Sequence, residues 1–164
     1  MSEELKKVDH AALTVNQIVI ILLNILAFVF NLRWLVAFVA VVMLLGTLFA
    51  VPGFVYVYRY VLRPLKLVKP HVLMDNPEPH RFAQGFGAVV MLVGTISLLA
   101  GVSLLGWVLV WLVVVLAGVN AFGGFCVGCF IYYWLGRLKL PGFYKEPPAG
   151  IFPGMRPRGI TNAS

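Results

Sequence analysis

Two cysteines are the residues best suited to chemistry in this chain. Cys126 and Cys129 form a Cys-Val-Gly-Cys step, and they are the only cysteines among the 164 residues. Thiols three residues apart on a helix share one face, at a separation of about 5 to 6 Å that a disulfide tolerates. The spacing therefore predicts disulfide formation, metal ligation or sulfur transfer.

Two glycines, Gly123 and Gly124, precede the cysteine pair, with only Phe125 between them and Cys126. The apolar stretch from Trp107 to Arg137 would be about 45 Å long as one helix, which exceeds a hydrocarbon core of about 30 Å. A helix break at the glycines would put Cys126 in the first turn of a new helix, where the dipole favours a thiolate. The alternative is that Gly124 and Gly128 form a surface for close helix packing, with the cysteines as small buried hydrophobes.

The hydrophobic composition indicates an integral membrane protein. Apolar residues make up 61% of the sequence and charged residues only 12%, a balance that soluble domains do not show. Since a span needs roughly 20 apolar residues, the sequence predicts an all-α polytopic fold with four transmembrane helices at 14–30, 34–58, 82–100 and 107–135. They form a single domain, 1–140, and the Pro/Gly-rich cytoplasmic tail, 141–164, is expected to be extended or disordered.

Basic residues are distributed unequally around these four spans. Twelve of the thirteen Lys and Arg residues flank one side, and only Arg33 lies on the other. Because cytoplasmic loops carry the Lys/Arg excess, both termini of this multi-pass membrane protein are predicted to be cytoplasmic. The net charge of +7 is thus assigned to topology and to contact with the lipid bilayer. A nucleic-acid partner is not predicted, because no soluble domain offers a groove.

Polar residues lie near the cytoplasmic ends of three predicted helices. The first and third helices start inside and the fourth ends inside, so their polar groups should converge on one face of the bundle. Such groups usually face the bundle interior or a cavity, which predicts a shared site. The alternative is a set of ordinary helix caps and interhelical hydrogen bonds. The candidate binding residues are Asp9, Asn16, Gln17, Asn76, Arg81, Gln84 and Asn120.

The candidate catalytic residues are the two thiols and two histidines from the same face. Cys126 would be the nucleophile, Cys129 the resolving thiol, and His80 or His10 a base or orienting group. The same four residues are the alternative ligand set for zinc or another soft metal. Apart from that alternative, no cofactor is predicted.

Three short motifs carry a resemblance to a known family. They are VDHAALTVNQ at 8–17, DNPEPHRFAQ at 75–84 and GFCVGC at 124–129. Over residues 7–140 the chain resembles the bacterial family catalogued as domain of unknown function 4395. The resemblance implies thiol or sulfane-sulfur chemistry alongside thioredoxin-like or rhodanese-like proteins.

These observations lead to two main hypotheses for the function. The first is a small membrane protein whose cytoplasm-facing dithiol serves thiol–disulfide redox or reduced-sulfur handling, as a thiol oxidoreductase or a sulfur-transfer component. The second is a subunit of a small-solute transporter or channel, in which the same polar groups line the substrate entry. With four short helices, transport would require a homo-oligomer. A structural membrane partner is the third interpretation.

Overall fold

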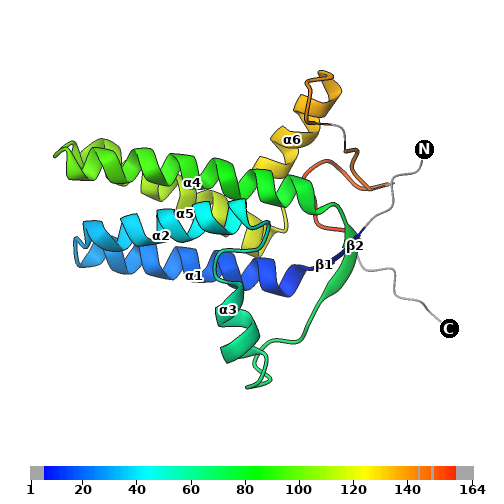
Figure 1. Ribbon diagram of the computed structural model, residues 1–164, viewed down its shortest axis with the longest axis horizontal. Helices are drawn as coiled ribbons and strands as arrows, with labels where there is room; N and C mark the ends of the chain where they lie inside the picture. Colours follow the sequence, from blue (N-terminus) through cyan, green and yellow to red (C-terminus); the bar gives the residue numbers. More distant parts are fainter. Residues whose placement is uncertain (1–5, 144, 149, 158–164) are drawn as a thin grey trace.

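Four helices packed side by side form the body of the molecule (Figure 1). The computed structural model describes residues 6–143, 145–148 and 150–157. The bundle helices are α1 (His10–Val29), α2 (Arg33–Leu48), α4 (Pro77–Leu99) and α5 (Ser103–Gly123). Tight turns at 30–32 and 100–102 connect them at one end of the bundle, which we call the turn end. The opposite end, which we call the polar end, holds Asp9, Asp75 and Cys126.

The remaining elements lie toward the polar end. Strands β1 (Lys6–Asp9) and β2 (Val72–Asp75) pair antiparallel, with Lys6 opposite Asp75 and Asp9 opposite Val72. The short helix α3 (Val55–Val57) continues into a π-helical turn, η1 (Tyr58–Leu62), which packs on α1. Helix α6 (Val127–Arg137) packs on α4 and leaves the bundle at a steep angle (Figure 1).

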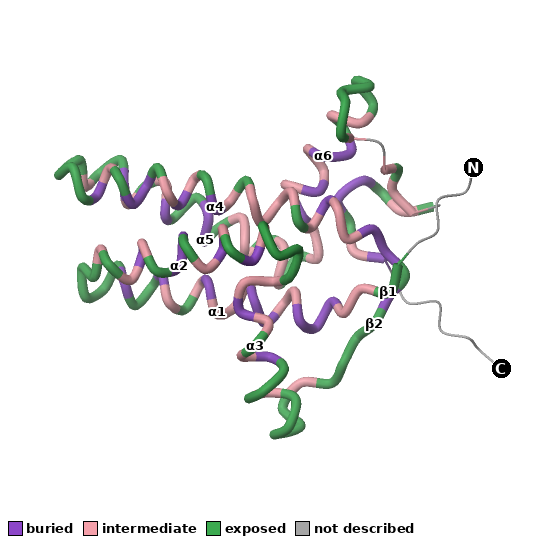
Figure 2. Tube along the Cα trace, viewed as in Figure 1, coloured by how far each residue is buried: buried purple, intermediate pink, exposed green. Residues whose placement is uncertain are grey.

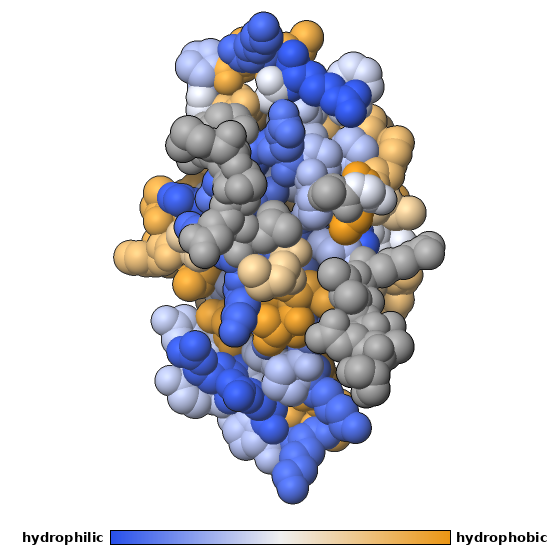
Figure 3. Space-filling model, turned by 90° about the vertical axis from the view of Figure 1, so that its right-hand side faces the viewer, coloured by the Kyte–Doolittle hydropathy of each residue, from blue (hydrophilic) through white to orange (hydrophobic). Residues whose placement is uncertain are grey.

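The bundle has the surface of a membrane protein. Helices α1, α4 and α5 are each long and apolar enough to cross a membrane, and α2, with 16 residues, is a shorter apolar helix. Buried residues follow the inner faces of the helices (Figure 2), while apolar side chains such as Leu22, Val89 and Leu104 are exposed outside. Hydrophilic residues gather on the polar end, which faces the viewer in Figure 3. This distribution suggests a protein whose sides contact lipid.

The core runs along the middle of the bundle. Four fully buried side chains belong to this core where α2 packs on α4: Val36 and Val39 of α2, and Ala88 and Met91 of α4. Nearer the turn end, a Cβ at Gly106 would lie 2.5 Å from Leu98 Cγ. The missing side chain therefore lets α4 and α5 approach closely, as small residues do in membrane helix pairs.

Two of the predicted helices are interrupted. The helix expected over 34–58 ends at Leu48, because Ala50 takes a left-handed φ of 56° and Pro52 has no N–H to continue the ladder. The chain then turns, and the Phe54 N–H donates to Asn16 Oδ1 at 2.8 Å. The apolar stretch at 107–135 is divided into α5 and α6, with Gly124 between them at a φ of 65°.

The described end of the tail folds back onto the start of α6. We call residues 150–157 the tail strap. The Cys126 N–H donates to the Gly154 carbonyl at 2.8 Å, and the Arg156 N–H donates to the Gly124 carbonyl at 2.9 Å. Phe125 and Met155 form an isolated antiparallel bridge. Where the sequence predicted an extended or disordered tail, these backbone hydrogen bonds hold the strap beside the cysteines.

Candidate functional site

The cysteine pair is built into the start of α6. Gly124 ends α5 in the left-handed region, where glycine has no Cβ penalty, and the chain then resumes as helix at Val127. Cys126 occupies the N-cap position, and its Sγ accepts the Cys129 N–H at 3.1 Å. The structure joins Cys126 and Cys129 in a disulfide, with their Cα atoms 5.2 Å apart. Both residues are buried, at 4% and 3% exposure.

A glycine contact brings this pair to α4. A Cβ at Gly128 would lie 2.5 Å from Ala83 Cβ and 2.7 Å from Ala83 Cα, so the two helices can touch only because residue 128 has no side chain. The contact sets Cys129 Sγ 3.4 Å from Nδ1 of His80, one turn before Ala83 on α4. The sequence left a helix break and close helix packing as alternatives. The structure has both, with the break at Gly124 and the close packing at Gly128.

A buried carboxylate lies on the other side of the His80 ring. Asp75 Oδ2 is 3.0 Å from His80 Nε2 and 3.1 Å from His10 Nε2, and the Asp75 side chain is only 5% exposed. The two imidazoles meet edge to face, with ring centroids 5.5 Å apart. His10 Nε2 is in close contact with the carboxylate but is not aligned for a hydrogen bond. A continuous cluster therefore runs from Cys129 through His80 and Asp75 to His10, and all of its members except the partly exposed His80 are buried.

The charge of Asp75 orients this cluster. Burial raises the pKa of the carboxyl, but the imidazoles of His10 and His80 and the backbone N–H of Asn76 outweigh it, so the pKa falls well below its ordinary value of 3.8. An ionised Asp75 carboxylate can only accept a hydrogen bond, so the His80 nitrogen that faces it must carry a proton. Neutral His80 is therefore the Nε2–H tautomer. The lone pair of Nδ1 is then directed at Cys129, as in a nucleophile–histidine–carboxylate triad.

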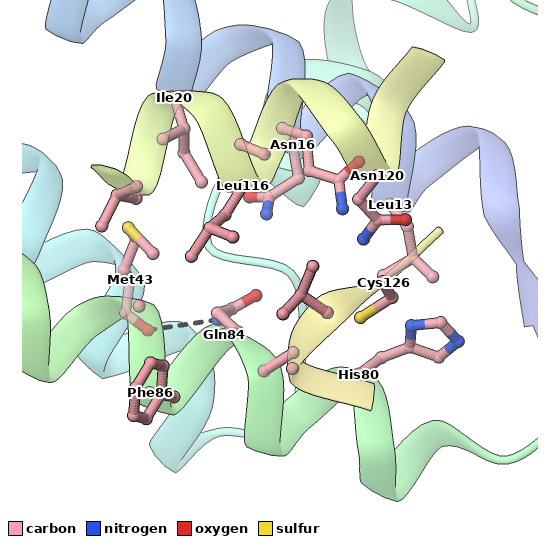
Figure 4. A pocket seen from close by; sticks show the side chains of 17 residues that line it. Leu13, Asn16, Ile20, Met43, His80, Gln84, Phe86, Leu116, Asn120 and Cys126 are labelled. Carbon is pink, nitrogen blue, oxygen red and sulfur yellow. Dashed lines mark hydrogen bonds between the residues drawn. The ribbon is translucent and has the colours of Figure 1, made fainter. Parts of the chain in front are cut away.

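A cavity of about 100 Å³ extends from Cys126 into the bundle. Figure 4 shows Asn16 and Asn120 on one side of this space, Gln84 on the other, and Cys126 with His80 at one end. The fourth amide of the wall is Gln17. A smaller cavity of about 20 Å³ touches both cysteines, His10, Asp75 and the tail strap.

The predicted site residues thus divide into two groups. Cys126, Cys129 and His80 are in direct contact, His10 joins them through Asp75, and four amides share the cavity with Cys126. The other three predicted residues make structural contacts away from the sulfurs. These are Asp9, whose carboxylate accepts the Ala11 N–H and the Tyr58 hydroxyl; Arg81, whose Nε donates to the Thr47 carbonyl; and Asn76, whose Nδ2 donates to the Glu146 carbonyl.

Three residues of the site were missed from the sequence. Asp75 was not among the candidate site residues, although its position five residues before His80 is the one signal that could have paired them. Gly154 and Arg156 were assigned to the tail. Arg156 Nη2 donates to Thr14 Oγ1 at 3.0 Å and to the Asn120 carbonyl at 3.5 Å, which no local pattern predicts.

The alternative metal ligands do not form one set of four. His80, Cys126 and Cys129 make one cluster, and His10, Asp75 and His80 make another, each with its ligand atoms within 4.8 Å. His10 therefore belongs with the carboxylate and not with the sulfurs. Since metals bind thiolates, the first cluster could act as a metal site only after reduction of the disulfide.

Comparison with known proteins gives one match. A family model described as Domain of unknown function (DUF4395) covers residues 8–137, which confirms the resemblance. No curated protein and no solved structure matches the chain. The matched range includes the whole Cys129–His80–Asp75–His10 cluster and ends before the tail strap.

Proposed function

The chain belongs to the DUF4395 family, and we propose that it is a membrane thiol–disulfide oxidoreductase that uses the Cys126–Cys129 pair. The observation that carries the proposal is the contact of 3.4 Å between Cys129 Sγ and His80 Nδ1, with Asp75 behind the ring. A packed structural disulfide has no need of a base on one sulfur. A dithiol that must open and close gains from such a base directly.

The chemistry assigns different roles to the two sulfurs. Cys126 is the sulfur that forms the mixed disulfide, because as a thiolate it would accept the Cys129 N–H at the positive end of the α6 dipole. It also borders the cavity of about 100 Å³, whereas Cys129 does not. Cys129 is the resolving thiol, and His80 takes its proton.

In the resolving step, Cys129 displaces the substrate sulfur from Cys126. In the mixed disulfide between Cys126 and a substrate sulfur, His80 Nδ1 takes the proton of the Cys129 thiol. The Cys129 thiolate attacks Cys126 Sγ and forms the intramolecular disulfide. The bond from Cys126 to the substrate breaks, and its electron pair leaves on the substrate sulfur as a thiolate. Reduction of the protein is the same sequence in reverse. If Cys126 carries a sulfane sulfur, the same attack releases hydrosulfide, which keeps reduced-sulfur handling within the proposal.

The placement in the membrane is part of the proposal. We assign four spans by counting α2, although its 16 residues rise only about 24 Å. Arg33 at the turn end donates to the Leu98 carbonyl at 3.1 Å, whereas the described basic residues of the central loop and tail belong to the polar end. With the Lys/Arg excess at the polar end, we propose that both termini and the dithiol lie on the cytoplasmic face of a bacterial inner membrane. A thioredoxin-like or rhodanese-like protein is the proposed partner.

The extent of the cavity supports redox chemistry over transport. Among the described residues, its wall reaches no further than Ile20 along α1 and Gly87 along α4. The halves of these helices beyond those residues pack through the apolar core around Met91. A site confined to one end suits a reaction at one membrane face, whereas a transport path needs access from both.

The proposal is tested on the full chain in lipid nanodiscs. Alkylation of thiols is followed by mass shift after equilibration with glutathione or dithiothreitol redox buffers. The pair should interconvert reversibly between no free thiols and two. Cys129→Ser should accumulate a mixed disulfide at Cys126 with a small thiol, and Cys126→Ser should not form one at Cys129. A pair that stays oxidised or reduced across the whole series of buffers contradicts the proposal.

A further inference from the structure

We infer that the amide-lined cavity beside Cys126 binds the ring of a quinone, and that this lipid-soluble carrier accepts electrons from the reduced Cys126–Cys129 pair. The inference rests on the proposed function, since it names the oxidant of the same dithiol. It concerns the cavity of about 100 Å³, which is several times the space that a water molecule needs.

The position of the cavity fits a ligand that arrives through lipid. Its wall is formed by the apolar helices α1, α4 and α5, with Met43 of α2 and the start of α6. Phe86 lines the wall and is itself 45% exposed on the outside of α4. The wall therefore adjoins the surface that lipid chains would contact. A ring carried on an isoprenoid tail matches an apolar cavity at this position.

The polar groups of the wall fit the two redox forms of a quinone. Gln17 Oε1 is buried and finds no hydrogen-bond partner among the described residues. Asn16 lines the cavity and accepts the Phe54 N–H through Oδ1. The NH₂ group of Asn16 is then the part of its side chain that is left to bind a ligand. Carboxamide NH₂ groups can donate to quinone carbonyls, and a free amide oxygen can accept from a quinol hydroxyl. These groups are also neutral, which avoids burying a charge in the bundle.

The tail strap distinguishes this route from a water-soluble oxidant. The strap lies on the other side of the pair, where the Gly154 carbonyl accepts the Cys126 N–H and Arg156 is one of the residues that line the smaller cavity. Cys126 borders both cavities. One sulfur can thus meet a thiol partner from the water side after the strap opens and a membrane carrier from the bundle side.

The reaction transfers two electrons and two protons. The Cys126 thiolate donates an electron pair to the quinone ring by forming a bond to a ring carbon. The Cys129 thiolate, whose proton has gone to His80, attacks Cys126 Sγ. The disulfide forms, the carbon–sulfur bond breaks, and its electron pair stays on the ring. The ring oxygens take up two protons in total, one derived from Cys129 through His80 and one from water, which gives the quinol and the disulfide.

The experiment uses the full chain, reduced and freed of reductant, in nanodiscs under anaerobic conditions. A short-chain ubiquinone analogue and a short-chain menaquinone analogue are added in separate arms. Quinone absorbance and free thiols are followed together, and one quinone should be consumed for each disulfide formed. Gln17→Leu and Asn120→Leu should each slow this reaction by about tenfold, the factor that corresponds to one lost hydrogen bond.

The matched control is Asn24→Leu, which replaces a buried amide of the same helix that does not line the cavity. It should oxidise at the wild-type rate. Asn24→Leu should also keep wild-type exchange with dithiothreitol, and circular dichroism spectra like that of the wild type should show that all three variants are folded. If the wild type exchanges with dithiothreitol but neither quinone oxidises it, the quinone inference is wrong and the proposed function stands. If the wild type reacts with neither dithiothreitol nor a quinone, the quinone inference and the proposed function are both wrong. Equal slowing by Asn24→Leu would also overturn the assignment of this cavity.

Discussion

Asp75 Oδ2 lies 3.0 Å from His80 Nε2, on the side of the ring that faces away from Cys129. The ring therefore joins a carboxylate to a sulfur through its two nitrogens. Its tautomer is set by a residue that does not touch the sulfur. This relationship separates the effects expected of variants at His80 and at Asp75.

Replacement of His80 should slow the resolving step without stopping it. His80→Ala removes the base that takes the Cys129 proton, and general-base groups contribute about 100-fold or more. The rate at which a mixed disulfide at Cys126 resolves should fall by about this factor near neutral pH. It should recover as the pH rises and Cys129 ionises without help, which a merely structural defect would not allow. His71→Ala, at an exposed histidine of the loop before β2, is the control and should resolve at the wild-type rate.

Asp75→Asn should affect both the stability and the rate. The pKa of Asp75 in the folded protein is below its ordinary value of 3.8. The ionised carboxylate therefore stabilises the fold fully above pH 3.8, and this stabilisation is lost as the pH falls from 3.8 toward the lower pKa of the folded state. The variant should be less stable than the wild type near neutral pH, by about 2 kcal/mol, the order expected for lost hydrogen bonds to a charged group. The difference should narrow in acid. Thermal unfolding in nanodiscs at a series of pH values measures it.

The rate effect of Asp75→Asn has its own cause. The amide that replaces the carboxylate can donate to His80 Nε2, which would favour the tautomer with its proton on Nδ1, facing Cys129. Resolution of the mixed disulfide should then slow although His80 is still present. Asp9→Asn is the matched control, because Asp9 caps α1 and accepts from Tyr58 without contacting His80. It should lower stability and leave the rate unchanged. Equal rates for Asp75→Asn and the wild type would contradict the tautomer argument.

The sequence predicted the helical parts of this molecule better than its connections. Apolar length alone predicts α1, α4 and α5. The starts of α1 and α4, which the sequence grouped with the cysteines, carry His10 and His80 of the cluster. The end of α2 was missed because its apolar pattern continues past Pro52, where the backbone can no longer follow it. Asp75 was missed because an acidic residue before Pro77 also suits a helix start. The tail strap was missed because it is held through the backbone groups of Gly124 and Cys126, which side-chain patterns do not report.

Gly128→Ala should separate α6 from α4. The added Cβ would lie 2.5 Å from Ala83 Cβ, so the helices must move apart, at a cost of about 1 to 3 kcal/mol for overpacking. Cys129 should then lose its contact with His80, and the resolving rate should no longer depend on whether His80 is present. Gly118→Ala is the matched control, since a Cβ there meets no atom within 4 Å and the helix should be unchanged or slightly stabilised. Unfolding temperatures and resolving rates, alone and combined with His80→Ala, measure both effects.

The tail strap should limit access of water-soluble thiols to the disulfide. Arg156 anchors it through the Thr14 hydroxyl and the Asn120 carbonyl, and both cysteines are nearly inaccessible beneath it. Arg156→Ala removes these side-chain hydrogen bonds while the backbone contacts remain. The strap should open more often, and reduction by dithiothreitol should be faster by several-fold, in proportion to the open fraction.

A second variant tests the strap without changing charge. Gly154 has a φ of 88°, and a Cβ there would lie 2.9 Å from the Cys126 carbonyl oxygen, so Gly154→Ala should displace the strap and also speed reduction. Lys69→Ala, which removes one exposed positive charge from the central loop, should not. Oxidation by a quinone should be unaffected in all three variants, because that route reaches Cys126 from the bundle. If Arg156→Ala and Gly154→Ala leave the rate of reduction unchanged, a soluble thiol must reach Cys126 by another path, and the strap has no part in access.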